Sequence, residues 1–278
     1  DGGMHALWRG ILPEHVFAAQ PPAWGVGRPG EADRAAALAT WEQQTRQLYA
    51  AHADEIAGVI LEPVVQGAGG MTFHDPRVVQ VLAELARGSG ALLILDEIAT
   101  GFRRTGPMWG ADHAGVVPDV MCVGKALTGG YLTLAAVLCS AEVAQAVSAE
   151  AAGGALMHGP TFMANPLACA VASASLDLLQ RNDSRANVEA VEAGLRAGLA
   201  PAAALDSVRD VRVLGAIGGI QLREPACGGE LAAYAIEQGV WVRPFRDLVY
   251  TMPPYVTGPT DLAQICAALV GAVAHVHG

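Results

Sequence analysis

The stretch Ala91-Leu-Leu-Ile-Leu-Asp-Glu-Ile-Ala-Thr-Gly-Phe102 runs from five aliphatic residues directly into two adjacent acids, Asp96 and Glu97. A short continuous hydrophobic run of this kind is typical of a strand buried in a parallel sheet. Ligands of open α/β sheets bind beyond the carboxyl ends of the strands, which is where Asp96 stands. The stretch therefore predicts a buried strand that carries a carboxylate to the edge of a ligand site.

Predicted helices and strands alternate on both sides of this stretch. Asp75 and Asn165 are each followed by proline, a combination that marks the start of a helix. Helices are expected at 32–53, 75–90, 165–181, 186–205, 228–239 and 260–276, and strands at 57–65, 91–95, 119–124, 134–140, 208–222, 240–245 and 248–253. Such alternation is typical of an α/β fold with a mainly parallel sheet. The pattern changes near Asn182, which predicts a large domain at 1–182 and a small C-terminal α+β domain at 183–278.

The composition narrows the class of protein. Of 278 residues, 52% are hydrophobic and 16% charged, and the net charge is −10. An acidic chain is a poor match for nucleic acid or an anionic membrane as its main partner. The hydrophobic runs are expected to be shorter than a membrane span. The run that comes nearest to that length is 132–147, and Glu142 interrupts it. The polar start of the chain is unlike a signal peptide, and five scattered cysteines suggest reduced thiols, so a cytoplasmic protein is expected.

Lys125 follows the strand predicted at 119–124, as Asp96 follows the strand before it. An acid and an amine at one rim of a sheet allow three interpretations: a structural salt bridge, a metal or phosphate site, or a site for pyridoxal phosphate. In the third, lysine forms a Schiff base and the acid keeps the pyridine nitrogen protonated. The two residues alone favour the salt bridge, which is the commonest of the three.

Longer segments around these residues change that weighting. They read LDEIATGFRRTG at 95–106, PDVMCVGKALTGGY at 118–131, HGPTFMANPLACA at 158–170 and VWVRPFRDLVYTMPPY at 240–255. Together they resemble the class III, fold type I aminotransferases, which use pyridoxal phosphate, and the resemblance covers essentially the whole chain. It implies a fold type I large domain, a small C-terminal domain and a homodimer.

Ala99 stands where many members of this family have a glutamine. With alanine at this position, the chain resembles the branch of the family that makes 7,8-diaminononanoate for biotin synthesis. That branch transfers an amino group from S-adenosylmethionine to 8-amino-7-oxononanoate, and the resemblance implies these two small-molecule substrates. It speaks against ornithine, acetylornithine and 4-aminobutyrate as substrates.

The resemblance also implies roles for individual residues. Asp96 would pair with the pyridine nitrogen, and Lys125 would form the Schiff base and then move the substrate proton. Thr161 would bind the cofactor phosphate of the neighbouring subunit, and Pro160 would be a further cofactor contact. Arg243 would hold the substrate carboxylate in a bidentate contact. Further substrate contacts are expected from Gly159, Arg246 and Tyr250.

Two departures from the family are visible. Arg103 replaces a family glycine, which predicts strain if the position needs a positive φ. The family's N-terminal part, with its phosphate-binding turn and ring-stacking aromatic residue, has no counterpart in these 278 residues. The piece alone is therefore expected to be poorly active, because positioning supplies much of the rate.

Less specific interpretations stay open beside these. Glu97 is expected to cap a turn or pair with an arginine, and Glu62 to make a structural contact near the site. A carboxylate-based metal hydrolase would use Asp96, Glu97, Asp112 and His113. No second ligand stands at usual metal spacing beside His113, so a metal is not expected. A non-catalytic remnant is the third class of function.

Overall fold

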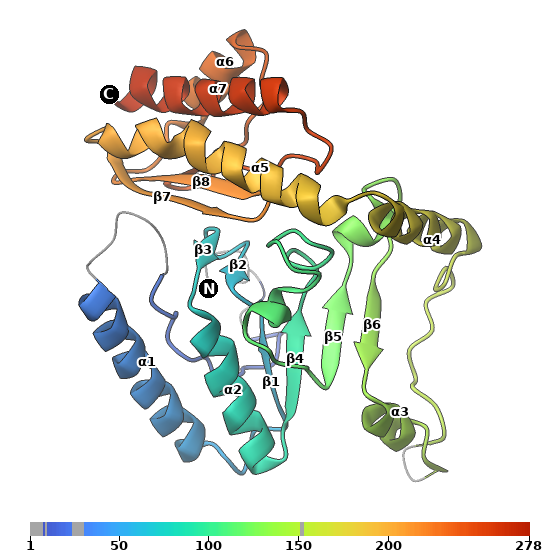
Figure 1. Cartoon of the computed structure of the whole chain (residues 1–278). Helices are drawn as coiled ribbons and strands as arrows, with labels where there is room; N and C mark the ends of the chain where they lie inside the picture. Colours follow the sequence, from blue (N-terminus) through green and yellow to red (C-terminus); the bar gives the residue numbers. More distant parts are fainter. Residues whose placement is uncertain (1–7, 9, 24–30, 151–152) are drawn as a thin grey trace.

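The computed structural model describes residues 8, 10–23, 31–150 and 153–278 (Figure 1). Its first part is built on a four-stranded sheet in the order β1-β4-β5-β6. The strands are β1 (Gly58–Leu61), β4 (Leu92–Asp96), β5 (Val120–Val123) and β6 (Ala136–Cys139). The first three run parallel, and β6 is antiparallel to β5. The mainly parallel sheet confirms the predicted fold class.

Helix α2 (Pro76–Ser89) covers one face of this sheet. The Asp75 side chain caps its start by accepting from Arg77 N, and Gly90 ends it with a left-handed φ of 75°. Buried alanine and valine side chains on its inner face pack in one cluster with Leu93 and Leu95 of β4. Figure 1 shows α1 (Glu31–Ala51) lying outside α2, against which it packs through Trp41.

Several shorter elements complete the first part. They are β2 (Val65–Gln66), β3 (Thr72–Phe73), η2 (Gly110–His113), η3 (Lys125–Thr128), α3 (Ala141–Val147) and α4 (Pro166–Arg181). Asn165 caps α4 by accepting from Ala168 N, as its sequence predicts. Helix α3 was not expected from the sequence. Ser140 starts it by accepting from Val143 N, a capping signal that is visible in the sequence.

The C-terminal part packs helices on one antiparallel sheet. It contains α5 (Ser184–Leu199), η5 (Ala200–Ala204), β7 (Val208–Leu214), β8 (Ile217–Leu222), α6 (Gly228–Glu237), β9 (Leu248–Thr251) and α7 (Pro259–His277). The chain passes from α4 to α5 at Asn182 and Asp183. This is the boundary expected from sequence, although the division into two domains stays a prediction.

The strand predicted at 240–245 is wrong. Only Phe245 forms a bridge, to Leu248, and the residues before it make no ladder. Pro244 lacks an N–H to donate, and Phe245 and Leu248 close a tight turn with two backbone hydrogen bonds of 2.8 and 2.9 Å. The predicted strand at 208–222 is a hairpin of β7 and β8, which turns at Gly215 with a φ of 54°.

Among the described residues, α7 is the one helix long and apolar enough to cross a membrane, with 19 residues and a mean hydropathy of 1.3. The expectation that residues 132–147 come nearest to a span is therefore wrong. One face of α7 is buried against α5, where a Cβ added to Gly198 would lie 2.6 Å from Cys266. About a third of its apolar window is buried in this way, so packing against α5 accounts for only part of the apolar character of α7.

The two parts meet at the β2–β3 hairpin, on which the C-terminal sheet rests (Figure 1). Their apolar contact joins Val64, Val65, Met71 and Phe73 to Leu214, Ile217 and Leu248. A buried arginine of β7, Arg212, crosses the same contact and donates to Met71 O at 2.8 Å and Gly70 O at 3.0 Å. The contact is therefore both apolar and hydrogen-bonded.

Candidate active site

Asp96 and Lys125 reach the same rim of the four-stranded sheet. Strands β4 and β5 are parallel neighbours, and Asp96 is in register with Cys122. Lys125 follows the end of β5 after one residue, Gly124. The half-buried Asp96 carboxylate accepts from Ile98 N at 3.0 Å, which holds it at the strand end. The Lys125 residue is exposed.

The backbone at Lys125 is strained. Its φ of 45° lies in the left-handed region, which costs a residue with a Cβ about 1–2 kcal/mol. Lys125 is the first residue of η3. Helix α4 contacts η3 through a 3.3 Å hydrogen bond from Ser175 Oγ to Ala126 O. Strained residues cluster at functional sites, where the surrounding structure compensates for them.

Asp96 and Lys125 do not form an ion pair in the described part of the chain, where every side-chain ion pair joins other residues. The structural salt bridge, which the two residues alone favoured, is therefore wrong. Asp96 and Lys125 therefore lie at the same rim without forming an ion pair. This arrangement suits two side chains that bind a ligand between them.

A third ionisable group, Glu62, stands at this rim. Leu61 of β1 is in register with Leu95 of β4, so Glu62 follows β1 beside Asp96. Gly67 N donates to Glu62 Oε1 at 3.1 Å. The pKa of the Glu62 carboxyl is raised above its ordinary value, mainly by burial and also by the Asp96 charge. The Gly67 hydrogen bond and the Lys125 charge act in the opposite direction. Glu62 is thus within electrostatic reach of both predicted site residues.

Glu97 caps a helix rather than facing the site. Its buried carboxylate accepts from Gly110 N at 2.9 Å and Ala111 N at 2.8 Å at the start of η2, and from Thr100 Oγ1 at 2.5 Å. Burial raises its pKa, and these hydrogen bonds lower it. The expectation that Glu97 caps a turn is confirmed, because its carboxylate binds Thr100 and two backbone N–H groups.

The acids and histidine of the metal-hydrolase hypothesis do not converge. Asp112 accepts from Trp109 N at 3.0 Å, and His113 Nε2 lies 3.0 Å from Thr105 O. The Glu97 carboxylate accepts hydrogen bonds from the backbone at the start of η2. Among the residues that the structure describes, no group of three or more His, Cys, Asp or Glu side chains could hold a metal ion. That set of ligands is therefore not assembled.

The loop after β4 is fastened to the C-terminal part. Arg104 Nη1 donates to Ala216 O at 3.1 Å and Pro253 O at 2.9 Å, and its guanidinium lies 4.7 Å from the centre of the Tyr255 ring. The Tyr255 hydroxyl in turn donates to Phe102 O in the loop, at 2.7 Å. Arg103 has a φ of 69°, so the expected strain at this replaced glycine is present.

The predicted phosphate and substrate residues lie outside this cluster. Gly159, Pro160 and Thr161 are exposed in the segment between α3 and α4. Arg243 and Arg246 are exposed, and Arg246 lies 5.1 Å over the ring of Phe245. The structure brings together Asp96 and Lys125 and adds Glu62. The roles of the other residues stay predictions.

Tyr250 also stands apart from Asp96 and Lys125. It is half-buried on β9, where it packs against the contact with the β2–β3 hairpin. A small hollow of about 330 Å³ near this hairpin is lined by Gln20, Gly70, Arg246 and Asp247, among others. Tyr250 therefore belongs to the joint between the two parts within this chain.

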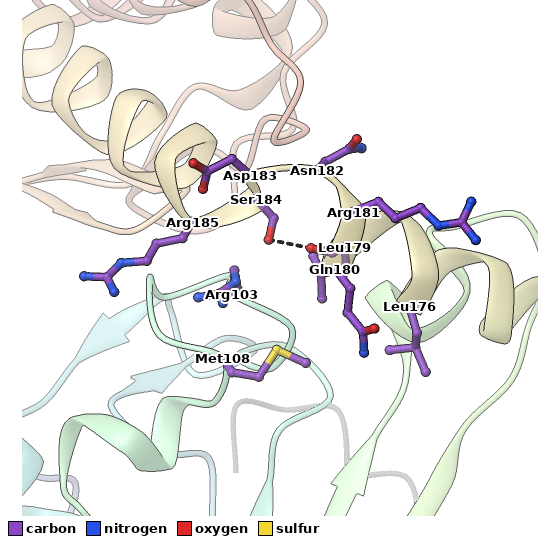
Figure 2. Close-up of a pocket in the computed structure, with 10 residues that line it drawn as sticks. All are labelled: Arg103, Met108, Leu176, Leu179, Gln180, Arg181, Asn182, Asp183, Ser184 and Arg185. Atoms are coloured by element: carbon purple, nitrogen blue, oxygen red, sulfur yellow. Dashed lines mark hydrogen bonds between the residues drawn. The ribbon is translucent and has the colours of Figure 1, made fainter.

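The larger hollow, of about 520 Å³, lies where α4 passes into α5 (Figure 2). Figure 2 shows Arg103 and Met108 of the loop facing the residues of the helix junction, where Ser184 donates to Leu179 O at 2.8 Å. Its lining does not include Asp96 or Lys125. The rim with Asp96 and Lys125 thus lies outside both of these hollows.

Lys125 has a further property in the printed sequence. It is the only lysine in the chain, and all other residues of the 17 Lys and Arg are arginines. Arginine is too basic to act as a neutral amine, so this chain has a single side chain that can form a Schiff base. Counting lysines is a signal that supports Lys125 without any structure.

Comparisons with known proteins agree with this geometry. The family model for class-III aminotransferases matches residues 2–273. The adenosylmethionine-8-amino-7-oxononanoate aminotransferase of Mycobacterium leprae is 53% identical over 97% of this chain and 59% of its own length. The protein of that name from Corynebacterium glutamicum is 47% identical over 98% of this chain and 62% of its own length. The chain thus spans about three fifths of these relatives.

Solved structures show the same fold. An (S)-enantioselective omega-transaminase from Thermomicrobium roseum aligns with a TM-score of 0.87 at 30% identity, covering 99% of this chain and 64% of that one. The adenosylmethionine-8-amino-7-oxononanoate aminotransferase of Methanocaldococcus jannaschii aligns with a TM-score of 0.79 at 30% identity, covering 85% and 58%. With the family model matched along nearly the whole length, this chain belongs to the class-III aminotransferases.

Proposed function

We propose that this chain provides the lysine and ring-nitrogen acid of an aminotransferase that moves an amino group from S-adenosylmethionine to 8-amino-7-oxononanoate. The names of the M. leprae and C. glutamicum relatives support these substrates. Ala99, three residues after Asp96, supports the same branch of the family. The product, 7,8-diaminononanoate, places the reaction in biotin synthesis.

The residues at the rim suit pyridoxal phosphate, a cofactor that a related amine transaminase structure contains. When bound, this cofactor supplies an electron sink for the carbanion formed at the substrate amine carbon. Asp96 is held by Ile98 N at a strand end, so its carboxylate can keep a ring nitrogen protonated. Lys125 is accessible and unpaired with Asp96, so its amine can bond to the cofactor and later carry a proton.

The remaining roles are proposed from the family resemblance. Thr161 would bind the cofactor phosphate of a second copy, with Pro160 as a further cofactor contact, and their exposure supports a role toward a partner subunit. The active unit would then be a cytoplasmic homodimer. Arg243 would hold the substrate carboxylate, and its exposed guanidinium is accessible for a bidentate contact. Gly159, Arg246 and Tyr250 would contribute to the same substrate pocket.

The observation that carries the proposal is the placement of Asp96 and the only lysine on adjacent parallel strand ends. The first test is titration of the purified chain with pyridoxal phosphate, followed by visible absorption. We expect a visible band that disappears in Lys125→Ala and persists in the surface variant Arg196→Ala. Absence of the band in the parent chain would contradict the proposal.

The amino donor needs a separate test, on a protein of the relatives' full length. Offered S-adenosylmethionine, glutamate or ornithine with 8-amino-7-oxononanoate, it should form 7,8-diaminononanoate fastest with S-adenosylmethionine. A preference for glutamate or ornithine would assign the chain to another branch of the class-III family.

A further inference from the structure

The loop that follows Asp96 is fastened to two adjacent strand ends of the C-terminal sheet. Strands β8 and β9 pair as antiparallel neighbours, so the start of β8 lies beside the end of β9. Arg104 Nη1 donates to Ala216 O, just before β8, and to Pro253 O, just after β9. A single guanidinium therefore holds both strand ends against the loop.

The backbones of the loop and of the C-terminal sheet are in direct contact beside this guanidinium. Ala216 N donates to Arg104 O at 3.0 Å. A Cβ added to Gly215 would lie 2.5 Å from Thr105 C and 2.6 Å from Arg104 O, closer than nonbonded atoms come in proteins. Any side chain at Gly215 would push the two segments apart, so the glycine permits their close approach.

Tyr255 is the second side chain of this contact. Its hydroxyl donates to Phe102 O at 2.7 Å, and its ring centre lies 4.7 Å from the Arg104 guanidinium. Burial raises the pKa of Tyr255, so the hydroxyl keeps its proton at neutral pH and can donate. Phe102 and Arg103 have φ values of 56° and 69°, a strained pair that persists only where surrounding contacts hold it. We call the contacts of Arg104 and Tyr255 the loop clamp.

The Phe102 side chain connects the loop clamp to the segment that carries Lys125. It is buried in one apolar cluster with Val123, the last residue of β5, and Leu127 of η3. Lys125, the first residue of η3, stands between these two in the sequence. The carbonyl of Phe102 is thus held by Tyr255, and its ring packs with the elements on either side of Lys125.

The other end of the loop clamp adjoins the residues proposed to contact substrate. Tyr250 stands on β9, three residues before Pro253, whose carbonyl accepts from Arg104. Arg243 and Arg246 lie in the segment that leads into β9. The loop clamp therefore joins the segment of the proposed carboxylate contacts to the segment of the lysine.

We propose that Arg104 and Tyr255 are positioning residues that set the separation between the substrate-carboxylate contacts and Lys125, an inference that rests on the proposed function of those residues. In 8-amino-7-oxononanoate, an aliphatic chain of fixed length separates the carboxylate from the carbonyl carbon that reacts. A site whose two ends are held at one separation selects acids of that chain length over shorter and longer ones. The loop clamp thus determines specificity without touching the substrate.

The first test uses the 278-residue chain without cofactor. Hydrogen–deuterium exchange is followed by peptide mass spectrometry in the parent chain and in Tyr255→Phe, which removes one hydroxyl and keeps the ring. We expect exchange about tenfold faster in the loop 101–106 and in η3, with α1 unchanged. The matched control is Tyr49→Phe, because the Tyr49 hydroxyl lies 2.6 Å from Ser89 Oγ in the α1–α2 region. It should leave the exchange of η3 unchanged.

The second test uses a protein of the relatives' full length with pyridoxal phosphate. The acceptors are 8-amino-7-oxononanoate and its homologues with one methylene fewer or one more. In Tyr255→Phe and Arg104→Met, we expect KM for 8-amino-7-oxononanoate to rise about tenfold with a smaller change in kcat. The preference over the homologues should fall about tenfold. The visible cofactor band should keep its position, because Asp96 and Lys125 are unaltered.

Unchanged exchange of η3 in Tyr255→Phe, or an unchanged chain-length preference in both variants, would overturn the inference. Equal effects in Tyr49→Phe would also overturn it, since they would reflect a general loss of stability. A parent protein that does not act on 8-amino-7-oxononanoate would reject the proposed function instead. The exchange measurement would then decide by itself whether the loop clamp couples the end of β9 to η3.

Discussion

The buried ion pair between Arg212 and Asp210 gives the sharpest prediction about stability. The two side chains are 2% and 0% exposed and lie 3.1 Å apart. Arg212 also donates to Gln221 Oε1 at 2.7 Å and to two carbonyls of the β2–β3 hairpin. Arg212→Met keeps an unbranched apolar stem but removes the guanidinium that pairs with Asp210. Removing one partner of such a pair costs about 3–5 kcal/mol.

The measurement is the free energy of unfolding from urea titration, followed by far-ultraviolet circular dichroism. Arg209→Met on the same strand is the matched control, because Arg209 is exposed and should cost less than about 0.5 kcal/mol. The double change Asp210→Asn with Arg212→Met should recover part of the loss, since both charges of the buried pair are then removed. A cost below about 1 kcal/mol for Arg212→Met would refute the view that this arginine fastens the two parts together.

Three further changes test the chain at other places. Arg103→Gly should stabilise it by about 0.5–1 kcal/mol, seen as a higher urea midpoint, because glycine tolerates the φ of 69°. Gly198→Ala should lower the thermal midpoint and cost about 1–3 kcal/mol, since the added Cβ would lie 2.6 Å from a side chain of α7. Hydrogen bonds from Arg77 lower the pKa of Glu42 and Glu84 below the ordinary 4.5. Their stabilisation is therefore complete above that pH and is lost as pH falls through the lowered values. Arg77→Gln should flatten this acid dependence of the urea midpoint, and an unchanged slope would show that these exposed pairs contribute nothing.

Local signals predicted the elements whose structure is decided within a few residues. Asp75 and Asn165 start helices because a short polar side chain satisfies the free N–H groups of the first turn. The run before Asp96 forms a central strand between β1 and β5, with Leu93 and Leu95 buried on one face while Leu92 on the other face is exposed. The same kind of reasoning failed at 240–245, where apolar residues lie in a turn that depends on Pro244 and on β9. It also failed at α3, a helix of seven residues that begins at a serine cap and buries no side chain.

By itself, the sequence determined the α/β class, the family, and the two residues at the strand ends, because hydrophobic runs, caps and family motifs are properties of short segments. Only the tertiary structure decided which groups share the rim. Glu62 joins Asp96 through strand register, and Glu97, the adjacent acid, turns away to η2. The carboxylates are chemically alike, so their roles follow from the backbone N–H groups and charges that folding brings to them from distant segments.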